Sequence, residues 1–298
     1  MKLASRRTYA VGAAGLGLAL LGAGAVPAGA TPGRTQAAPP AISEQNVMGH
    51  LKEFQKIADR SGGNRAFGTK GYERSLAYVK GVLDKAGFTT RIDSFTYKGT
   101  AGHNLIADWP GGDTNHTLFA GAHLDSVKAG PGINDNGSGS AAILATAQAV
   151  AKGHLKPKRH LRFAWWDAEE EGLVGSAQYL KKLPTADRKK VDAYMNFDMT
   201  GSKTFKQMII MRDSEEATDA FEKYLAAKNI PIFEVQAGDA GSDHSSFHKA
   251  GIPVTSLATD LDDCTHMACD RFDNVDPKLE TTSANAINSV IWQLAATR

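Results

Sequence analysis

Apolar residues recur at helical spacing near both ends of the chain. Residues 43–60 place Val47, Leu51, Phe54 and Ile57 on one face of a helix, with polar residues between them. The same pattern predicts two further long helices, over residues 72–86 and 278–296. These helices have an apolar stripe and a polar face, so we expect each to cover a buried layer.

Between these helices the pattern changes to short runs rich in β-branched and aromatic residues. Such runs predict strands, and we expect them at residues 89–97, 104–109, 117–122, 161–166, 193–197, 207–211, 231–235 and 252–257. Helical segments are expected between them at residues 138–151, 175–182, 215–228 and 242–250. Strands that alternate with helices favour a parallel sheet. The sequence therefore predicts an α/β fold: a single three-layer domain with a mostly parallel central sheet, antiparallel edge strands and helices on both faces. The first two strands are expected to form such an edge.

The start of the chain has the organisation of an export signal. Arg6 and Arg7 precede a weakly apolar stretch over residues 11–26, and a small-x-small cleavage pattern follows at residues 28–30. A transmembrane helix needs roughly 20 apolar residues, more than this stretch provides. We therefore expect a twin-arginine export signal over residues 1–30, a secreted protein, and no membrane attachment after the signal is removed.

The signal also sets the domain limits and the charge balance. Residues 31–40 are rich in alanine and proline, which indicates a flexible leader or a short pro-segment and leaves residues 41–298 for the folded domain. Three of the 34 basic residues, Lys2, Arg6 and Arg7, lie in the signal, and the chain has 32 acidic residues. The exported chain is therefore close to neutral and has no basic block, so we expect no nucleic-acid partner.

The two cysteines, Cys264 and Cys269, lie five positions apart. In an exported protein a disulfide is the usual state of such a pair. The alternative is a metal–thiolate site with His266 between them, which would need more soft ligands than this chain has. We therefore predict a Cys264–Cys269 disulfide.

The stretch over residues 121–140 is the first with candidate metal ligands. His123 and Asp125 end an apolar strand, and Asp135 follows in a loop rich in glycine and asparagine. Residues two apart in an extended chain point to the same side, so the Asp125 carboxylate can hold the His123 ring with its other nitrogen facing a metal. Taken alone, a His-x-Asp pair is more often a satisfied hydrogen bond than a metal site.

Further carboxylates and a second histidine follow other predicted strands: Glu169 with Glu170, then Asp198, then His266. In open α/β sheets, sites collect at the carboxyl ends of strands. Imidazoles combined with carboxylates suit zinc, and Asp135 could bridge two ions. Adjacent strand residues point to opposite faces, so Glu169 and Glu170 can both reach the site only beyond the strand. One would then bind metal and its neighbour could take a proton. Without the other residues, this acidic segment would equally make a solvated turn.

Several motifs resemble those of the secreted two-zinc aminopeptidases of bacteria, which are leucyl-aminopeptidase-like and have the zinc exopeptidase fold. The motifs are GAHLDSV, GINDNGSGSAA, LRFAWWDAEEEGLVGS, MNFDMTGS, GSDHSSFHKAGIPV and the C-x-H-x-x-C loop. The resemblance covers roughly residues 43–298 in matching order and spacing. It implies that residues 41–298 form a zinc exopeptidase domain.

The resemblance also implies a role for each candidate residue. Two Zn²⁺ ions would be bound by five ligands: His123, Asp135, Glu170, Asp198 and His266. Asp135 would bridge the ions, with His123 and Asp198 on one and Glu170 and His266 on the other. Their neighbours Glu169 and Asp125 would be the general base and the orienting partner of His123.

Two local features follow from the same comparison. The bridging aspartate of such enzymes often precedes a non-proline cis peptide, so we expect one between Asp135 and Asn136. Relatives commonly have a tyrosine just before the final histidine ligand, where its hydroxyl can help a tetrahedral intermediate. This chain has Thr265 there, which is too short for that role. We therefore expect substrate preference and turnover to differ from those relatives.

The resulting functional hypothesis is a secreted, monomeric metallo-aminopeptidase that hydrolyses the N-terminal bond of peptides with a free amino terminus. The resemblance implies a preference for hydrophobic first residues and a bridging water activated by two zinc ions. Two alternatives share the fold: a single-zinc enzyme similar to glutaminyl cyclases, and a non-catalytic peptide-binding domain. A serine hydrolase is not supported, since the sequence has no G-x-S-x-G.

Overall fold

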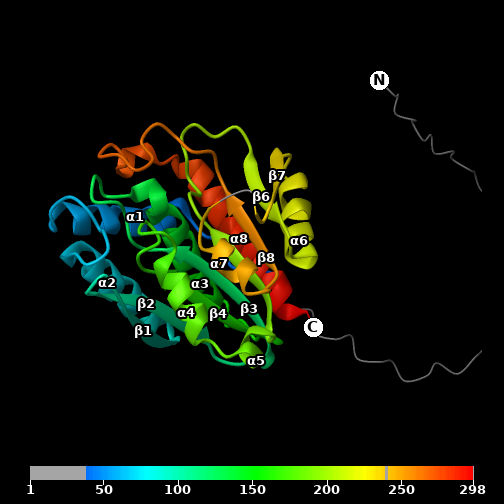
Figure 1. Cartoon of the computed structure of the whole chain (residues 1–298). Helices are drawn as coiled ribbons and strands as arrows, with labels where there is room; N and C mark the ends of the chain where they lie inside the picture. The colour runs from blue at the N-terminus through cyan, green and yellow to red at the C-terminus, as the bar shows by residue number, and fades with distance from the viewer. Residues whose placement is uncertain (1–37, 239–240, 298) are drawn as a thin grey trace, which may run out of the picture. The chain divides into compact units, whose positions relative to one another are not determined.

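An eight-stranded sheet runs through the part of the chain that the computed structural model describes, residues 38–238 and 241–297 (Figure 1). Its strands are β1 (Thr89–Tyr97), β2 (Thr100–Trp109), β3 (Asp113–His123), β4 (Arg159–Trp166), β5 (Val191–Phe197), β6 (Met208–Arg212), β7 (Ile232–Gln236) and β8 (Val254–Ala258). Their order across the sheet is β1-β2-β4-β3-β5-β8-β6-β7. The predicted export signal lies outside the described residues.

The centre of the sheet is parallel and both edges run against it. Strands β4, β3, β5 and β8 are mutually parallel. The β1–β2 hairpin forms one edge and pairs antiparallel with β4, as the sequence predicted for the first two strands. At the other edge β6 is antiparallel to β8, while β7 is parallel to β6. The predicted fold class is confirmed, and the reversal at β6 is an addition to it.

Alternation along the central strands separates two apolar layers. In β4, Leu161, Phe163 and Trp165 belong to one buried cluster, while Ala164 and Trp166 belong to the other, as expected for side chains that alternate across a strand. The first layer is covered by α1 (Glu44–Asp59), α2 (Lys70–Ala86), α3 (Gly139–Lys152), α6 (Glu215–Ala226) and α8 (Pro277–Ala296). The second is covered by α4 (Val174–Lys182) and α7 (His244–Lys249). The molecule therefore has the three predicted layers.

The helices begin and end at residues whose side chains suit those positions. The hydroxyls of Ser43 and Thr69 accept hydrogen bonds from backbone N–H groups in the first turns of α1 and α2. Gly87 ends α2 with a left-handed φ of 93°. A short helix, α5 (Thr185–Arg188), was not predicted. Among the described residues, no helix is long and apolar enough to cross a membrane.

The largest local difference from the prediction precedes α3. A π-helical turn, Ile133–Ser138, comes first, and Asp135 within it has non-helical backbone angles. α3 then begins at Gly139, where a Cβ atom would lie only 2.1 Å from the carbonyl oxygen of Phe197. Because glycine has no Cβ, the start of α3 can lie directly against the end of β5. This close approach places the loop with Asp135 beside the residue that follows β5.

Candidate metal centre

The predicted ligands come together at the carboxyl edge of neighbouring strands. His123 is the last residue of β3, and Asp198 directly follows β5. Glu170 lies in the turn after β4, whose last residue, Trp166, is in register with His123. Because β4, β3 and β5 are adjacent and parallel, their carboxyl ends meet at one place, where sites form in open α/β sheets.

Two groups of ligand atoms share the carboxylate of Asp135. In the first, His123 Nε2 lies 3.3 Å from Asp135 Oδ1 and 3.4 Å from Asp198 Oδ1. In the second, His266 Nε2 lies 3.1 Å from Asp135 Oδ2 and 3.2 Å from Glu170 Oε2. Within each group all ligand atoms are within 4.8 Å of one another. The structure thus brings the five expected ligand side chains together, in the expected pairing.

The backbone turns sharply beside the candidate ligands. Ala168, Met199 and His266 have positive φ angles of 56°, 62° and 62°, a conformation that costs a non-glycine residue about 1–2 kcal/mol. Ala168 follows β4 and precedes Glu169 and Glu170, so both glutamates lie on a turn and not on opposite faces of a strand. This is the condition under which both can serve one site.

Asp125 contacts the turn with the two glutamates as well as His123, its predicted partner. His123 Nδ1 lies 3.2 Å from the backbone carbonyl oxygen of Asp125 and 3.5 Å from its Oδ1. The Asp125 carboxylate also accepts the backbone N–H groups of Glu169 at 3.2 Å and Glu170 at 3.3 Å. A proton on Nδ1 would leave Nε2 as the free acceptor for a metal. Asp125 therefore positions both the histidine and the turn with the two glutamates.

The side chains of Asn136 and Ser242, to which sequence reasoning assigned no role, hold the segment around Asp198. Asn136 Nδ2 donates to the carbonyl oxygen of Phe197 at 2.9 Å, and its Oδ1 accepts the N–H of Met199 at 3.2 Å. Ser242 Oγ donates to Asp198 Oδ2 at 2.6 Å, leaving Oδ1 toward His123. The only sequence signal was their presence in the quoted motifs. The predicted cis peptide between Asp135 and Asn136 is present.

A buried arginine supports the loop that precedes Asp135. Arg65 is fully buried, and its Nε donates to the carbonyl oxygen of Pro131 at 2.8 Å. Its two Nη atoms donate to the carbonyl oxygens of Leu124 and Gly132. Burial lowers the pKa of Arg65 to about 10 against the opposing effect of nearby carboxylates, so the guanidinium stays charged at neutral pH. Nothing in the local sequence distinguishes Arg65 from a surface arginine.

Two carboxylates of the cluster, those of Glu169 and Glu170, hold protons at neutral pH when no metal is bound. Burial, reinforced by the charges of Asp198 and other acids against that of His123, raises the pKa of Glu169 to about 10. Burial likewise raises the pKa of Glu170 to about 8. For Asp135 burial acts in the opposite direction to the hydrogen bonds from His123 and His266, which prevail and lower its pKa. Like charges packed this closely favour either protons or a cation.

The pKa values of the two imidazoles are raised, so that both rings favour the protonated form. For His123 burial opposes the charges of Asp198 and Glu169, which prevail and raise its pKa well above the usual value. The hydrogen bond to Asp135 raises the pKa of His266 to about 9, against partial burial. The two rings also differ in exposure: the side chain of His123 is 1% exposed and that of His266 is 58% exposed. The second group of ligands is therefore the one that faces solvent.

The residues present fit divalent cations. Within the described chain, Glu170 Oε1 and Asp198 Oδ1 are buried without a hydrogen-bond partner, and a bound cation would satisfy such atoms. One imidazole and two carboxylates in each group make a donor set of the kind that zinc accepts, with an open position left for water or substrate. The arrangement can therefore hold two ions, one on each side of Asp135.

The loop that presents His266 is closed as predicted. Cys264 and Cys269 form a disulfide, with their Cα atoms 5.2 Å apart. β8 ends at Ala258, so His266 lies in this loop, between the two cysteines and beyond the end of the strand. Thr265 Oγ1 accepts the backbone N–H of Asp262 at 3.2 Å. Its hydroxyl is therefore engaged within the loop.

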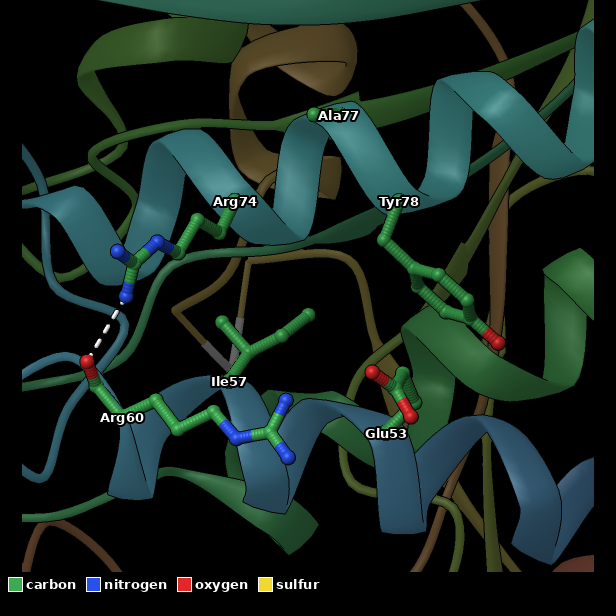
Figure 2. A pocket seen from close by; sticks show the side chains of 6 residues that line it. All are labelled: Glu53, Ile57, Arg60, Arg74, Ala77 and Tyr78. Atoms are coloured by element: carbon green, nitrogen blue, oxygen red, sulfur yellow. Dashed lines mark hydrogen bonds between the residues drawn. The ribbon is translucent and has the colours of Figure 1, made fainter.

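A cavity of about 600 Å³ lies elsewhere, between α1 and α2 (Figure 2). It is lined by Glu53, Ile57, Arg60, Arg74, Ala77 and Tyr78. Among these residues, Arg74 Nη1 donates a hydrogen bond to the carbonyl oxygen of Arg60 at 2.8 Å. None of the lining residues is a candidate ligand, and we assign this cavity no role.

Comparison with known proteins identifies the family. A family model described as peptidase family M28 matches residues 104–291. Leupeptin-inactivating enzyme 1 of Streptomyces exfoliatus is 45% identical over 315 residues, which cover 98% of this chain and 71% of that protein. Leucine aminopeptidase 2 of Trichophyton rubrum is 42% identical over 167 residues, 52% of this chain and 33% of that protein. The chain therefore spans about a third of the length of this fungal relative.

Solved structures support the fold. A zinc aminopeptidase from Bacillus subtilis matches with a TM-score of 0.78 at 13% identity, covering 86% of this chain and 96% of that one. The family model covers more than half of the chain and includes all five candidate ligands. The family resemblance read from the sequence motifs is confirmed: this chain belongs to peptidase family M28.

Proposed function

We propose that this protein is an exported zinc aminopeptidase that removes the first residue from peptides with a free amino terminus. The observation that carries the proposal is the pair of ligand groups sharing Asp135, with His123 and Asp198 in one and Glu170 and His266 in the other. Family membership and the names of the two relatives, a leupeptin-inactivating enzyme and a leucine aminopeptidase, support it. We further propose export by the twin-arginine route, removal of residues 1–30, a leader over residues 31–40, and a monomeric catalytic domain over residues 41–298.

The proposed cofactor is two Zn²⁺ per chain, held by the five ligands described above. When bound, the ions would polarise the scissile carbonyl and lower the pKa of the attacking water. Side chains of the protein position the ligands. Asp125 keeps His123 oriented and holds the turn with both glutamates. Ser242 keeps one oxygen of Asp198 occupied, so that the other is directed to the ligand group.

Glu169 is the proposed general base. In the metal-free cluster its raised pKa keeps it protonated at neutral pH. It becomes a carboxylate only when positive charge replaces the protons of the cluster, since an opposite charge favours the ionised form. Glu169 would then take a proton from the attacking water and return it to the leaving amine. This dependence ties base catalysis to an occupied site.

The substrate terminus would be recognised by the same cluster. A protonated or neutral amino group fits beside carboxylates, whereas an acetylated terminus offers neither charge nor a free lone pair. A preference for a hydrophobic first residue follows from the resemblance and from the name of the fungal relative. In a single-zinc cyclase one of the two ligand groups would bind no metal ion. In a non-catalytic peptide-binding domain neither group would bind one.

The decisive experiment compares two neighbouring substitutions. Glu169→Gln keeps the shape and can still hydrogen-bond water but cannot accept its proton, so kcat should fall by about 10²–10⁴-fold. Its zinc content should stay at the wild-type value. Glu170→Gln removes a charged ligand, so zinc and activity should fall together. Zinc content is measured by mass spectrometry after dialysis, and activity with a chromogenic aminoacyl substrate.

Four other results would change the proposal. Near wild-type activity in Glu169→Gln would mean that another group transfers the proton. Loss of zinc in Glu169→Gln but not in Glu170→Gln would reverse the two roles. A wild-type protein with one zinc per chain would favour the cyclase, and one with none would favour the binding domain.

A further inference from the structure

The loop with His266 needs something to fix it relative to the rest of the centre. The His266 side chain is 58% exposed, so packing alone does not hold it. The disulfide joins Cys264 to Cys269 at the two ends of the loop, which constrains the loop itself but does not attach it to Asp135. Nevertheless His266 Nε2 lies within 3.1 Å of Asp135 Oδ2. Two carboxylates just outside the disulfide make that attachment.

Asp270, which directly follows Cys269, binds the backbone of the bridging aspartate. Its Oδ1 accepts the N–H of Asn134 and its Oδ2 accepts the N–H of Asp135, both at 2.8 Å. Its own carbonyl oxygen accepts the N–H of Ile133 at 3.1 Å. The Asp270 side chain is almost completely buried, so these bonds are protected from competition with water. One end of the loop is thereby fixed to the turn that carries Asp135.

Asp262 makes the matching attachment before the disulfide. Its Oδ1 accepts the N–H of Cys264 at 2.9 Å. Its Oδ2 accepts hydrogen bonds from Asn134 Nδ2 at 3.1 Å and from Ser202 Oγ at 3.2 Å. Asn134 is therefore held by both carboxylates, through its side chain by Asp262 and through its backbone by Asp270.

A further amide links the two carboxylates. Asn274 Nδ2 donates to Asp262 Oδ2 at 3.0 Å and to Asp270 Oδ1 at 3.3 Å. The Asn274 side chain thus connects the two carboxylates, which belong to one hydrogen-bond network. Hydrogen bonds that accept at a carboxylate are stronger than neutral ones, and connected networks hold a single arrangement better than isolated bonds do.

We propose that Asp262 and Asp270 are paired positioning residues that dock the His266 loop onto the Asn134–Asp135 segment. Through this docking they set the distance between His266 and the shared carboxylate, and so the geometry of the solvent-facing metal site. The inference rests on the proposed function for its test by zinc binding, but not for its test by hydrogen exchange. Residues that orient ligands in this way typically change metal affinity by 10–100-fold when they are replaced.

The test uses Asp262→Ala and Asp270→Ala, with Asp263→Ala as the matched control because Asp263 is an exposed neighbour in the same loop. Zinc alone is titrated into each metal-free protein. We expect the dissociation constant of the weaker zinc to rise by about 10–100-fold in the first two variants. The tighter zinc, which would use His123 and Asp198, should bind as in wild type. The control should match wild type at both sites.

A second measurement does not depend on zinc. Hydrogen exchange of metal-free protein should become faster in peptides that cover residues 133–138 and 262–272 in both variants, while peptides from α8 keep their wild-type protection. A general loss of stability would instead raise exchange everywhere and weaken both zincs equally, and this result would overturn the proposal. So would wild-type exchange in those two segments together with wild-type affinity for both zincs.

Should an alanine variant not fold, Asp262→Asn and Asp270→Asn keep the side-chain shape while replacing one acceptor oxygen by a donor. They are judged by the same criteria. Failure of the proposed function is recognised separately. If the wild-type chain itself binds fewer than two zincs, the two-zinc proposal falls, and the exchange data still decide whether Asp262 and Asp270 dock the loop.

Discussion

Zinc binding to the metal-free protein should release protons in an amount that the structure specifies. Metal ligands must be deprotonated, so binding displaces whatever protons the ligands carry. At pH 7 the pKa of about 9 at His266 leaves that ring almost fully protonated, and the pKa of about 8 at Glu170 leaves it about nine-tenths protonated. His123, with its pKa well above the usual value, adds a further proton. Asp135, whose pKa is lowered, adds none.

These ligands together should release close to three protons per chain at pH 7. Glu169 should add about one more, because its raised pKa of about 10 falls when cations occupy the neighbouring sites. The expected total is therefore about three to four protons for two zincs. At pH 9.5 His266 and Glu170 have already lost most of their protons, so the release should drop by roughly one and a half to two protons.

Calorimetric titration of zinc in buffers with different ionisation enthalpies measures this number directly. The variant Glu169→Gln separates the proton released by the general base from the protons released by the metal ligands. It should bind two zincs and release about one proton fewer than wild type. The reasoning would be refuted by a release of less than one proton at pH 7, or by a release that does not change between pH 7 and 9.5. An unchanged release in Glu169→Gln would show that Glu169 is not the group that ionises on loading.

Two further predictions concern stability and the loop. Glu169 and Glu170 have raised pKa values in the folded metal-free protein, so the folded state holds protons that the unfolded state loses above about pH 4.5. The free energy of unfolding should therefore fall as pH rises from 5 to 8, by about 1.4 kcal/mol per pH unit for each retained proton. Urea unfolding measures it, and a rise over this range would contradict the assignment. Replacing both Cys264 and Cys269 by serine should weaken the zinc on His266 while the other stays bound, because the loop loses its closure. Equal weakening of both zincs, measured by chelator competition, would argue against a local role.

The features that could be predicted from the sequence were those with a local signal. Apolar alternation in β4 and helical spacing in α1 identified the layers. The order of His123, Asp135, Glu170 and Asp198 after successive strands identified the site, because adjacent parallel strands end at one edge. The reversal of β6 had no such signal, since its direction depends on pairing with β8, far along the chain.

The supporting residues of the site were missed for the same reason. Arg65 binds carbonyl groups that lie about sixty residues away in sequence, and Asp270 binds amides that precede it by more than a hundred residues. Ser242 meets Asp198 only through the tertiary fold. A polar side chain of this kind resembles any loop residue until its partner is known.

The central claim is that two zinc ions on the ligands around Asp135 hydrolyse the first bond of a peptide with a free amino terminus. Its most direct test is a titration of zinc into the metal-free protein, with leucine p-nitroanilide and its N-acetylated form assayed at each step. The account predicts that cleavage of the free-amine substrate rises to a plateau at two zincs per chain, and that the acetylated substrate stays intact throughout. Equal cleavage of both substrates, or full activity before any zinc is bound, would contradict it.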